Sequence, residues 1–172
     1  MIELGKKKIF YTIQPRYVWR YWQRQGYLQA KDTDDEYFIG SYTWMKEQMK
    51  QRVPSYKGEP LIWFWDEVPA GYRTWSNDKR KKYVLLTIEL DERDVLASDY
   101  NGWHWVLSGY MNCDHPKPCE DEWPYEKIFD LPFMKQEIYD EGSEQELQYT
   151  TGRIEMSSVK NVKYFTGKRR SY

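Results

Sequence analysis

The chain has 172 residues, a length typical of one domain whose core needs no disulfide bonds. Its 40% apolar and 31% charged residues exclude a disordered chain, and its net charge of −1 excludes a strong overall attraction to nucleic acid or membranes. Two cysteines exclude a disulfide framework.

The first third of the chain predicts one strand and two helices. Residues 9–13 are aromatic and β-branched, which favours a strand. Residues 16–25 carry a helical apolar spacing that ends at Gly26, a residue suited to the left-handed turn after a helix. An acidic entrance and apolar residues at spacings of four, three and four predict a second helix over residues 34–52.

The middle third predicts two strands and a short helix. Residues 61–65 are apolar on both faces, as expected of a central strand. Residues 83–90 alternate between two faces, the pattern of a half-buried strand. A loop or cap around Asp99 then leads into a short helix over residues 103–110.

The last third is less regular. Residues 112–122 are polar and Pro-rich, which indicates a surface loop. Residues 123–140 have a helical pattern interrupted at Pro132, residues 147–158 read as a strand with a bend, and residues 162–166 as a strand or turn. This mixture predicts an α+β fold, with a mixed or antiparallel sheet of about five strands and three to four helices.

The chain shows no sign of a domain boundary or a targeting segment. We expect a single domain over residues 1–172, in which residues 168–172 form a frayed basic tail. No apolar stretch has the length of a signal peptide or of the about 20 residues of a membrane span. The cytoplasm is therefore the expected compartment.

The most unusual feature is the aromatic content. Nine Trp and sixteen Tyr are more than the core of one such domain requires, and these side chains favour half-buried grooves and interfaces. Trp63 and Trp65 alternate with Phe64, so both point to one face of their strand. They either form a stacking platform for a flat ligand or pack beneath a helix.

Three further positions carry candidate chemistry, each with a plainer structural explanation. Asp99 and His104 could form a carboxylate–imidazole pair, or Asp99 could cap a helix. Glu155 could bind a ribose hydroxyl or act as a general base, or it could lie in solvent beside Arg153. No Ser or Cys has a spacing that ties it to Asp99 and His104, so the sequence does not support a hydrolytic triad.

Metal and phosphate sites receive weaker support. Cys113, His115 and Cys119 offer three zinc ligands where a structural site uses four, so we expect free thiols and no metal site. Basic clusters at residues 6–8, 79–82 and 168–170 would form a phosphate-binding stripe if they met, or they are solvated charged faces. The first two flank predicted strands. Acidic runs elsewhere argue against broad nucleic-acid binding.

Six motifs spread over nearly the whole chain carry a family resemblance. They are Tyr11-Thr12-Ile13-Gln14-Pro15, Tyr42-x-Trp44-Met45-x3-Met49-x2-Arg52, Pro60-x2-Trp63-x-Trp65, Val95-Leu96-x-Ser98-Asp99-x3-Trp103-His104-x-Val106-Leu107, Trp123-x3-Lys127-Ile128-Phe129-Asp130 and Ile154-x4-Val159-x2-Val162. Their order and spacing resemble those of an uncharacterised bacterial family, the domain of unknown function DUF3841. The resemblance implies a small stand-alone cytoplasmic protein and implies no activity.

A second resemblance concerns the first strand and helix. A Tyr-Thr strand followed by a helix closed by Gly26 is similar to the entrance of ADP-ribosyltransferase-like folds. That resemblance implies NAD as the cofactor, with Tyr11 at the first-strand position that holds NAD and Glu155 at the late-strand position that orients the ribose. The family's His or Arg is absent from residues 9–13, and its Ser-Thr-Ser motif is absent from the chain.

Two functions follow as hypotheses, and the sequence leaves open whether the protein is an enzyme. In the first, the protein recognises a nucleotide such as NAD, in a cleft lined by Tyr11, Gln14, Trp65 and His104 with Glu155 on the ribose. In the second, it is a non-catalytic interaction module whose aromatic side chains form a protein-binding patch. The partner is accordingly a small nucleotide or another protein.

Overall fold

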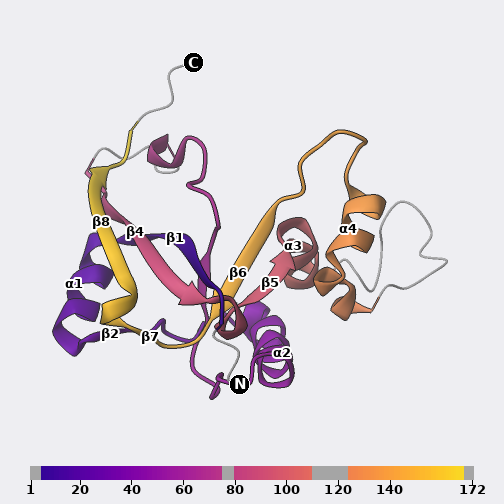
Figure 1. The fold of residues 1–172 in the computed structure, drawn as a ribbon, viewed down its shortest axis with the longest axis horizontal. Coiled ribbons are helices and arrows are strands. Elements are labelled where there is room, and N and C mark those ends of the chain that lie inside the picture. Colours follow the sequence, from indigo (N-terminus) through magenta and orange to yellow (C-terminus); the bar gives the residue numbers. More distant parts are fainter. Residues whose placement is uncertain (1–4, 75–79, 110–123, 169–172) are drawn as a thin grey trace.

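The computed structural model describes residues 5–74, 80–109 and 124–168, and Figure 1 shows how their helices and strands are arranged. The α-helices of these ranges are α1 (Arg16–Gln25), α2 (Glu36–Arg52), α3 (Tyr100–Ser108) and α4 (Leu131–Ile138). The strands are β1 (Lys7–Pro15), β2 (Tyr27–Leu28), β3 (Ile62–Phe64), β4 (Lys82–Asp91), β5 (Leu96–Asp99), β6 (Leu147–Thr151), β7 (Ile154–Glu155) and β8 (Val159–Thr166). Short 3₁₀ turns are η1 (Tyr72–Thr74), η2 (Glu92–Asp94), η3 (Tyr125–Phe129) and η4 (Met156–Ser158). The α+β class predicted from the sequence is confirmed.

The strands pair antiparallel in three small sheets, where the sequence predicts one sheet of about five strands. The first sheet has the order β1-β4-β8, the second has the order β3-β6-β5, and the third pairs β2 with β7. The strand with the clearest alternation in the sequence, β4, is the central strand of the first sheet. Most strands therefore pair with partners that are distant along the chain.

The first and second sheets are joined where β1 passes the end of β3. The Tyr11 N–H donates to the Trp65 carbonyl over 2.8 Å, and the Trp65 N–H donates to the Tyr11 carbonyl over 2.9 Å. The sequence predicts a central strand here, but β3 lies at the edge of its own sheet, with Ile62 and Phe64 buried. The bridge to β1 supplies the second neighbour that such an apolar strand needs.

The ends of three helices lie at residues whose types favour a helix start or stop. Helix α1 ends at Gly26, whose φ of 85° is left-handed and whose N–H donates to the Trp22 carbonyl over 2.9 Å. Helix α2 begins after Asp35, whose carboxylate accepts from the Tyr37 N–H over 3.0 Å. Pro132 lies in the first turn of α4, so it begins this helix and does not interrupt a longer one.

The predicted strand over residues 147–158 ends early, at Thr151. The backbone of Gly152 approaches the side chains of Tyr56 and Glu59, and a Cβ at this position would lie 2.8 Å from the Glu59 Oε2. Only glycine permits this approach without displacing a neighbour. The chain turns here, and Glu155 consequently lies on the separate two-residue strand β7.

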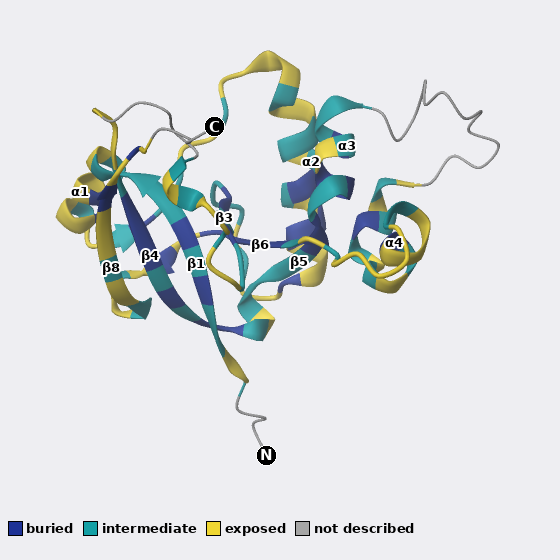
Figure 2. Cartoon of the chain, turned by 90° about the horizontal axis from the view of Figure 1, so that it is seen from above, coloured by how far each residue is buried: buried dark blue, intermediate teal, exposed yellow. Residues whose placement is uncertain are grey.

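Two hydrophobic clusters use much of the aromatic content. The first surrounds β1 and β4, whose buried stretches are visible in Figure 2, and includes Phe10, Trp22 and Phe64. The second lies among α2, α3, η3 and α4 and includes Met49 and Trp103. Of the apolar stripe predicted along α2, Met45 and Met49 are buried in this cluster and Tyr42 packs against it.

A pH-dependent contribution to stability arises at the end of β4. The Arg93 guanidinium donates to the Asp91 carboxylate over 2.9 and 3.0 Å, and the Arg93 N–H donates over 3.0 Å. These bonds lower the pKa of Asp91 from 3.8 to about 2. Because the folded-state pKa is the lower one, the carboxylate stabilises the fold fully above pH 3.8, and this contribution is lost as the pH falls through about 2.

We therefore expect Asp91→Asn to lower the thermal midpoint more at about pH 6 than at about pH 2. The reason is that the wild-type carboxylate itself becomes protonated at the lower pH. Thermal unfolding followed by circular dichroism at both pH values measures the difference. An equal loss at the two pH values would show that the ion pair does not stabilise the fold.

Candidate functional site

A cleft of about 770 Å³ lies beside the junction of the first two sheets. Its walls come from the segment after β3, from the first residue of α3, from α4 and from the segment that enters β6; Figure 1 shows α3 and α4 beside β5 and β6. The lining residues are Trp65, Asp66, Glu67, Val68, Pro69, Ala70, Tyr100, Lys135, Glu144, Gln145, Glu146 and Leu147.

The lining of this cleft is acidic. It contains four carboxylates, those of Asp66, Glu67, Glu144 and Glu146, against one ammonium group, that of Lys135, so its formal charge is −4 + 1 = −3. The whole chain carries only −1. A concave surface with charge of one sign raises the local concentration of ions of the opposite sign, so the cleft attracts cations.

One of these carboxylates is held by a network that joins β1, the segment after β3, and β6. The Lys8 ammonium donates to the Asp66 Oδ2 over 3.1 Å and to the Tyr149 hydroxyl over 3.3 Å. The Tyr149 hydroxyl in turn donates to the same Oδ2 over 2.9 Å. Asp66 is therefore fixed at the edge of the cleft while its side chain remains 33% exposed.

The protonation states of this network follow from its surroundings. Burial raises the pKa of Tyr149, and the hydrogen bond to Asp66 raises it further. Burial lowers the pKa of Lys8, but the hydrogen bonds to Asp66 and Tyr149 outweigh this effect and the pKa is raised overall. Both groups thus keep their protons at neutral pH, and Asp66 accepts from both.

The back of the cleft is positioned by Asp99, a fully buried residue. One oxygen of its carboxylate accepts from the Gly102 N–H over 2.8 Å and caps α3. The other oxygen accepts from the Gln145 side-chain amide over 2.8 Å, and this amide also donates to the Leu131 carbonyl over 2.9 Å. Asp99 therefore fixes the orientation of a cleft-lining side chain and does not touch the cleft itself.

Two aromatic residues complete the lining. Trp65 follows β3 and is held by its backbone bridge to Tyr11. Tyr100 begins α3, and its N–H donates to the Glu146 carbonyl over 2.9 Å. The Tyr100 ring lies 4.3 Å from the exposed His104 ring, whose Nδ1 is 2.8 Å from the Tyr100 carbonyl. The imidazole thus contacts a wall of the cleft, and the two Asp99 oxygens are engaged by Gly102 and Gln145.

The structure brings together four of the predicted site residues around this cleft: Tyr11, Trp65, Asp99 and His104. Trp65 lines it, and the other three support residues that do. Trp63 does not take part, because its ring stacks on Trp103 at 5.1 Å within the second hydrophobic cluster. The two tryptophans therefore form no shared stacking platform.

The remaining predicted residues lie elsewhere. The Gln14 amide donates to the Thr12 hydroxyl on the same strand over 3.0 Å. Glu155 is 67% exposed, opposite Tyr27 in the sheet of β2 and β7, and forms an ion pair with Arg153 at 3.5 Å. Glu155 is not among the residues that line the cleft, and its strand β7 pairs with β2, whereas β1 pairs with β4. Cys113, His115 and Cys119 lie outside the described residues.

Sequence reasoning missed most of the charged lining. Two local signals were available: Asp66 and Glu67 directly follow the predicted strand over residues 61–65, which has two tryptophans, and three acidic residues lie within positions 141–146. No sequence pattern indicated that these two segments meet. Among the described residues, no three His, Cys, Asp or Glu side chains are grouped so that they could hold a metal ion.

Comparison with known proteins gives one match. A family model described as a domain of unknown function (DUF3841) matches residues 9–163. No curated protein and no solved structure matches the chain. None of the helices in the described ranges has the length and apolar character that crossing a membrane requires.

Proposed function

The chain belongs to the DUF3841 family, whose description states no activity, and we propose that it is a recognition module whose acidic cleft binds a lysine or arginine side chain of a partner protein. This proposal develops the interaction module with an aromatic patch that the sequence suggested. The observation that carries it is the combination of four carboxylates with two aromatic side chains around one concavity.

Each part of the lining suits a cationic side chain. Carboxylates form short charge-assisted hydrogen bonds with guanidinium and ammonium groups. Trp65 and Tyr100 also line the cleft, and aromatic rings attract the same groups through their π-electrons, an interaction of about 0.5–2 kcal/mol depending on solvent exposure. The alkyl part of an arginine or lysine packs against apolar lining such as Val68 and Leu147.

Recognition of NAD in this cleft is less well supported. The diphosphate of NAD carries negative charge, which the carboxylates of the lining repel. Glu155, the residue proposed to orient the ribose, lies on a different sheet. The cleft therefore favours a ligand of the opposite charge.

The proposal is tested with two short peptides that differ at one residue, arginine in one and citrulline in the other. Citrulline has nearly the shape of arginine without its charge. By isothermal titration calorimetry at low salt, we expect the arginine peptide to bind with a Kd of about 1 mM or tighter, and the citrulline peptide about tenfold more weakly. Equal binding of the two peptides, or no binding of either, contradicts the proposal.

A further inference from the structure

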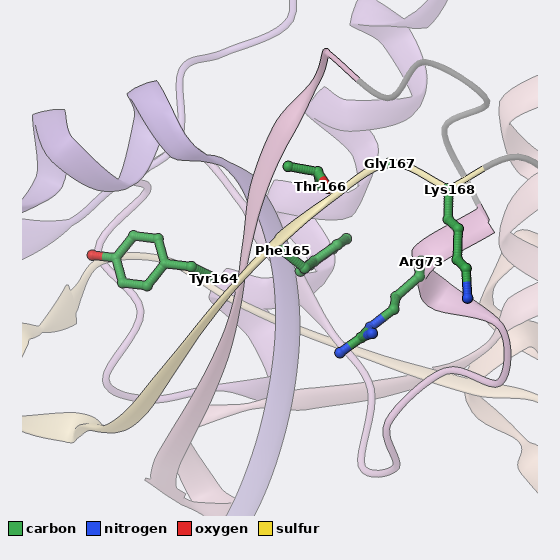
Figure 3. A pocket seen from close by; sticks show the side chains of 6 residues that line it. All are labelled: Arg73, Tyr164, Phe165, Thr166, Gly167 and Lys168. Atoms are coloured by element: carbon green, nitrogen blue, oxygen red, sulfur yellow. The ribbon is translucent and has the colours of Figure 1, made fainter.

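A second concavity lies on the first sheet, at the C-terminal end of β8. It has a volume of about 430 Å³ and is lined by Arg73 of η1 and by the segment from Tyr164 to Lys168. Figure 3 shows the Arg73 and Lys168 side chains on the same side of β8 as the Phe165 ring, with Tyr164 pointing away from them. The lining residues include two cations and no carboxylate.

We propose that this basic cleft binds a phosphate group, carried by a nucleotide or by the backbone of a single-stranded nucleic acid. The site is independent of the acidic cleft, since the two linings share no residue and carry opposite charge. It also differs from the NAD site that the sequence suggested, because none of Tyr11, Gln14 and Glu155 lines it.

The fold gathers the positive charge from three separate segments of the chain. The Lys168 N–H donates to the Arg73 carbonyl over 2.8 Å, which holds η1 against the end of β8. The Gly167 N–H donates to the Lys81 carbonyl over 3.0 Å, and Lys82 pairs with Thr166 in the sheet register. Part of the basic cluster predicted at residues 79–82 thus meets the start of the basic tail.

The cluster at residues 6–8, in contrast, lies at the other end of the sheet. Lys7 pairs with Asp91, the last residue of β4, whereas Lys82 is the first residue of β4. The sequence allowed the first two basic clusters to meet, and the antiparallel register separates Lys7 from Lys82. The positive charge of the basic cleft therefore comes from Arg73 and Lys168 in its lining and from Lys82, which pairs with Thr166.

The floor of the cleft consists of packed aromatic rings. The Phe165 ring is buried between Tyr83, stacked at 5.5 Å, and Tyr72, which meets it edge-on at 4.9 Å. The alternation of β8 places Lys163 on the same face as Phe165. The side chains of Arg73 and Lys168 are exposed beside this floor, so both are accessible to an anion in the cleft.

The local field at this cleft is positive. Burial tends to raise the pKa of Tyr72, but hydrogen bonds and charge interactions with Arg73 and Lys163 outweigh it, and the pKa is lowered. A lowered tyrosine pKa means that negative charge is stabilised at this position. Guanidinium and ammonium groups recognise phosphate oxygens through the same interactions.

The experiment measures the binding of adenosine, AMP, pyrophosphate and a short single-stranded oligonucleotide to the full chain by calorimetry at low salt. We expect the phosphate-bearing probes to bind and adenosine to bind at least about tenfold more weakly than AMP. Tighter binding of AMP or pyrophosphate than of the oligonucleotide identifies a nucleotide site, and the reverse order identifies a nucleic-acid site. Equal binding of adenosine and AMP, or no binding of any phosphate-bearing probe at about 10 mM, overturns the proposal.

Two variants locate the binding. Arg73→Gln and Lys168→Gln, both at exposed positions, are expected to weaken phosphate binding about tenfold each with an unchanged thermal midpoint. The matched control is Lys160→Gln, on the same strand but ion-paired to Glu89 at 3.6 Å, which should leave the Kd unchanged. Phosphate binding that Arg73→Gln and Lys168→Gln leave intact would place the ligand elsewhere and overturn the assignment.

Discussion

Replacing Asp99 with alanine is expected to destabilise the protein by about 2–4 kcal/mol, because one buried carboxylate serves two partners. The substitution removes the cap of α3, which typically costs about 1–2 kcal/mol. It also removes one of the two acceptors of the half-buried Gln145 amide, which keeps its bond to the Leu131 carbonyl, and such a hydrogen bond typically contributes about 1–2 kcal/mol. Urea unfolding followed by tryptophan fluorescence measures the free energy of unfolding.

The matched control for this variant is Asp130→Ala. Asp130 caps α4 by accepting from the Phe133 N–H over 3.3 Å, but it is exposed. Water can replace its contacts, so the expected loss is about 0.5–1 kcal/mol. If Asp99→Ala costs no more than Asp130→Ala, the buried network behind the cleft contributes nothing to stability beyond an ordinary cap.

Reversing two charges of the acidic cleft is expected to abolish measurable binding of the arginine peptide. Glu144→Lys combined with Glu146→Lys changes the formal charge of the lining from −3 to −3 + 4 = +1. Each exposed charge pair contributes about 0.2–1 kcal/mol, so losing two attractions and adding two repulsions weakens binding about thirtyfold. Calorimetry with the same peptide measures this loss.

The control for the charge reversal is Glu47→Lys combined with Glu89→Lys. These two glutamates form ion pairs with Lys50 and Lys160 and do not line the cleft, yet their reversal changes the net charge by the same amount. We expect them to weaken peptide binding only slightly, through long-range charge that salt screens. A loss as large as that of the cleft variant would mean that net charge and not the cleft governs binding.

Local patterns predicted the elements well. Gly26 ends α1, an acidic residue caps α2, and the alternating run became the central strand β4. Asp99 at the start of α3 has the capping role that the sequence allowed as one alternative. These features depend on residues within one turn or a few strand positions, which is the range that periodicity and capping describe.

The positions of the site residues depend on contacts between segments that are distant along the chain. Strand pairing places Glu155 opposite Tyr27 and joins Trp65 to Tyr11. Neither pairing can be predicted from the spacing of residues in the sequence. The turn at Gly152, which separates β7 from β6, is set by contact with Tyr56 and Glu59. The acidic cleft likewise unites two segments about 80 residues apart, so its charge could be recognised only once the topology was known.

The most direct test of the acidic cleft follows two side-chain signals by nuclear magnetic resonance during a titration with N-acetyl-arginine amide. The signals are those of the Gln145 side-chain amide and the Trp65 indole N–H, which lie on opposite segments of the lining. We expect both to shift progressively with the arginine compound and to stay in place with the citrulline equivalent. Shifts confined to other residues, or the same shifts with both compounds, would contradict the account.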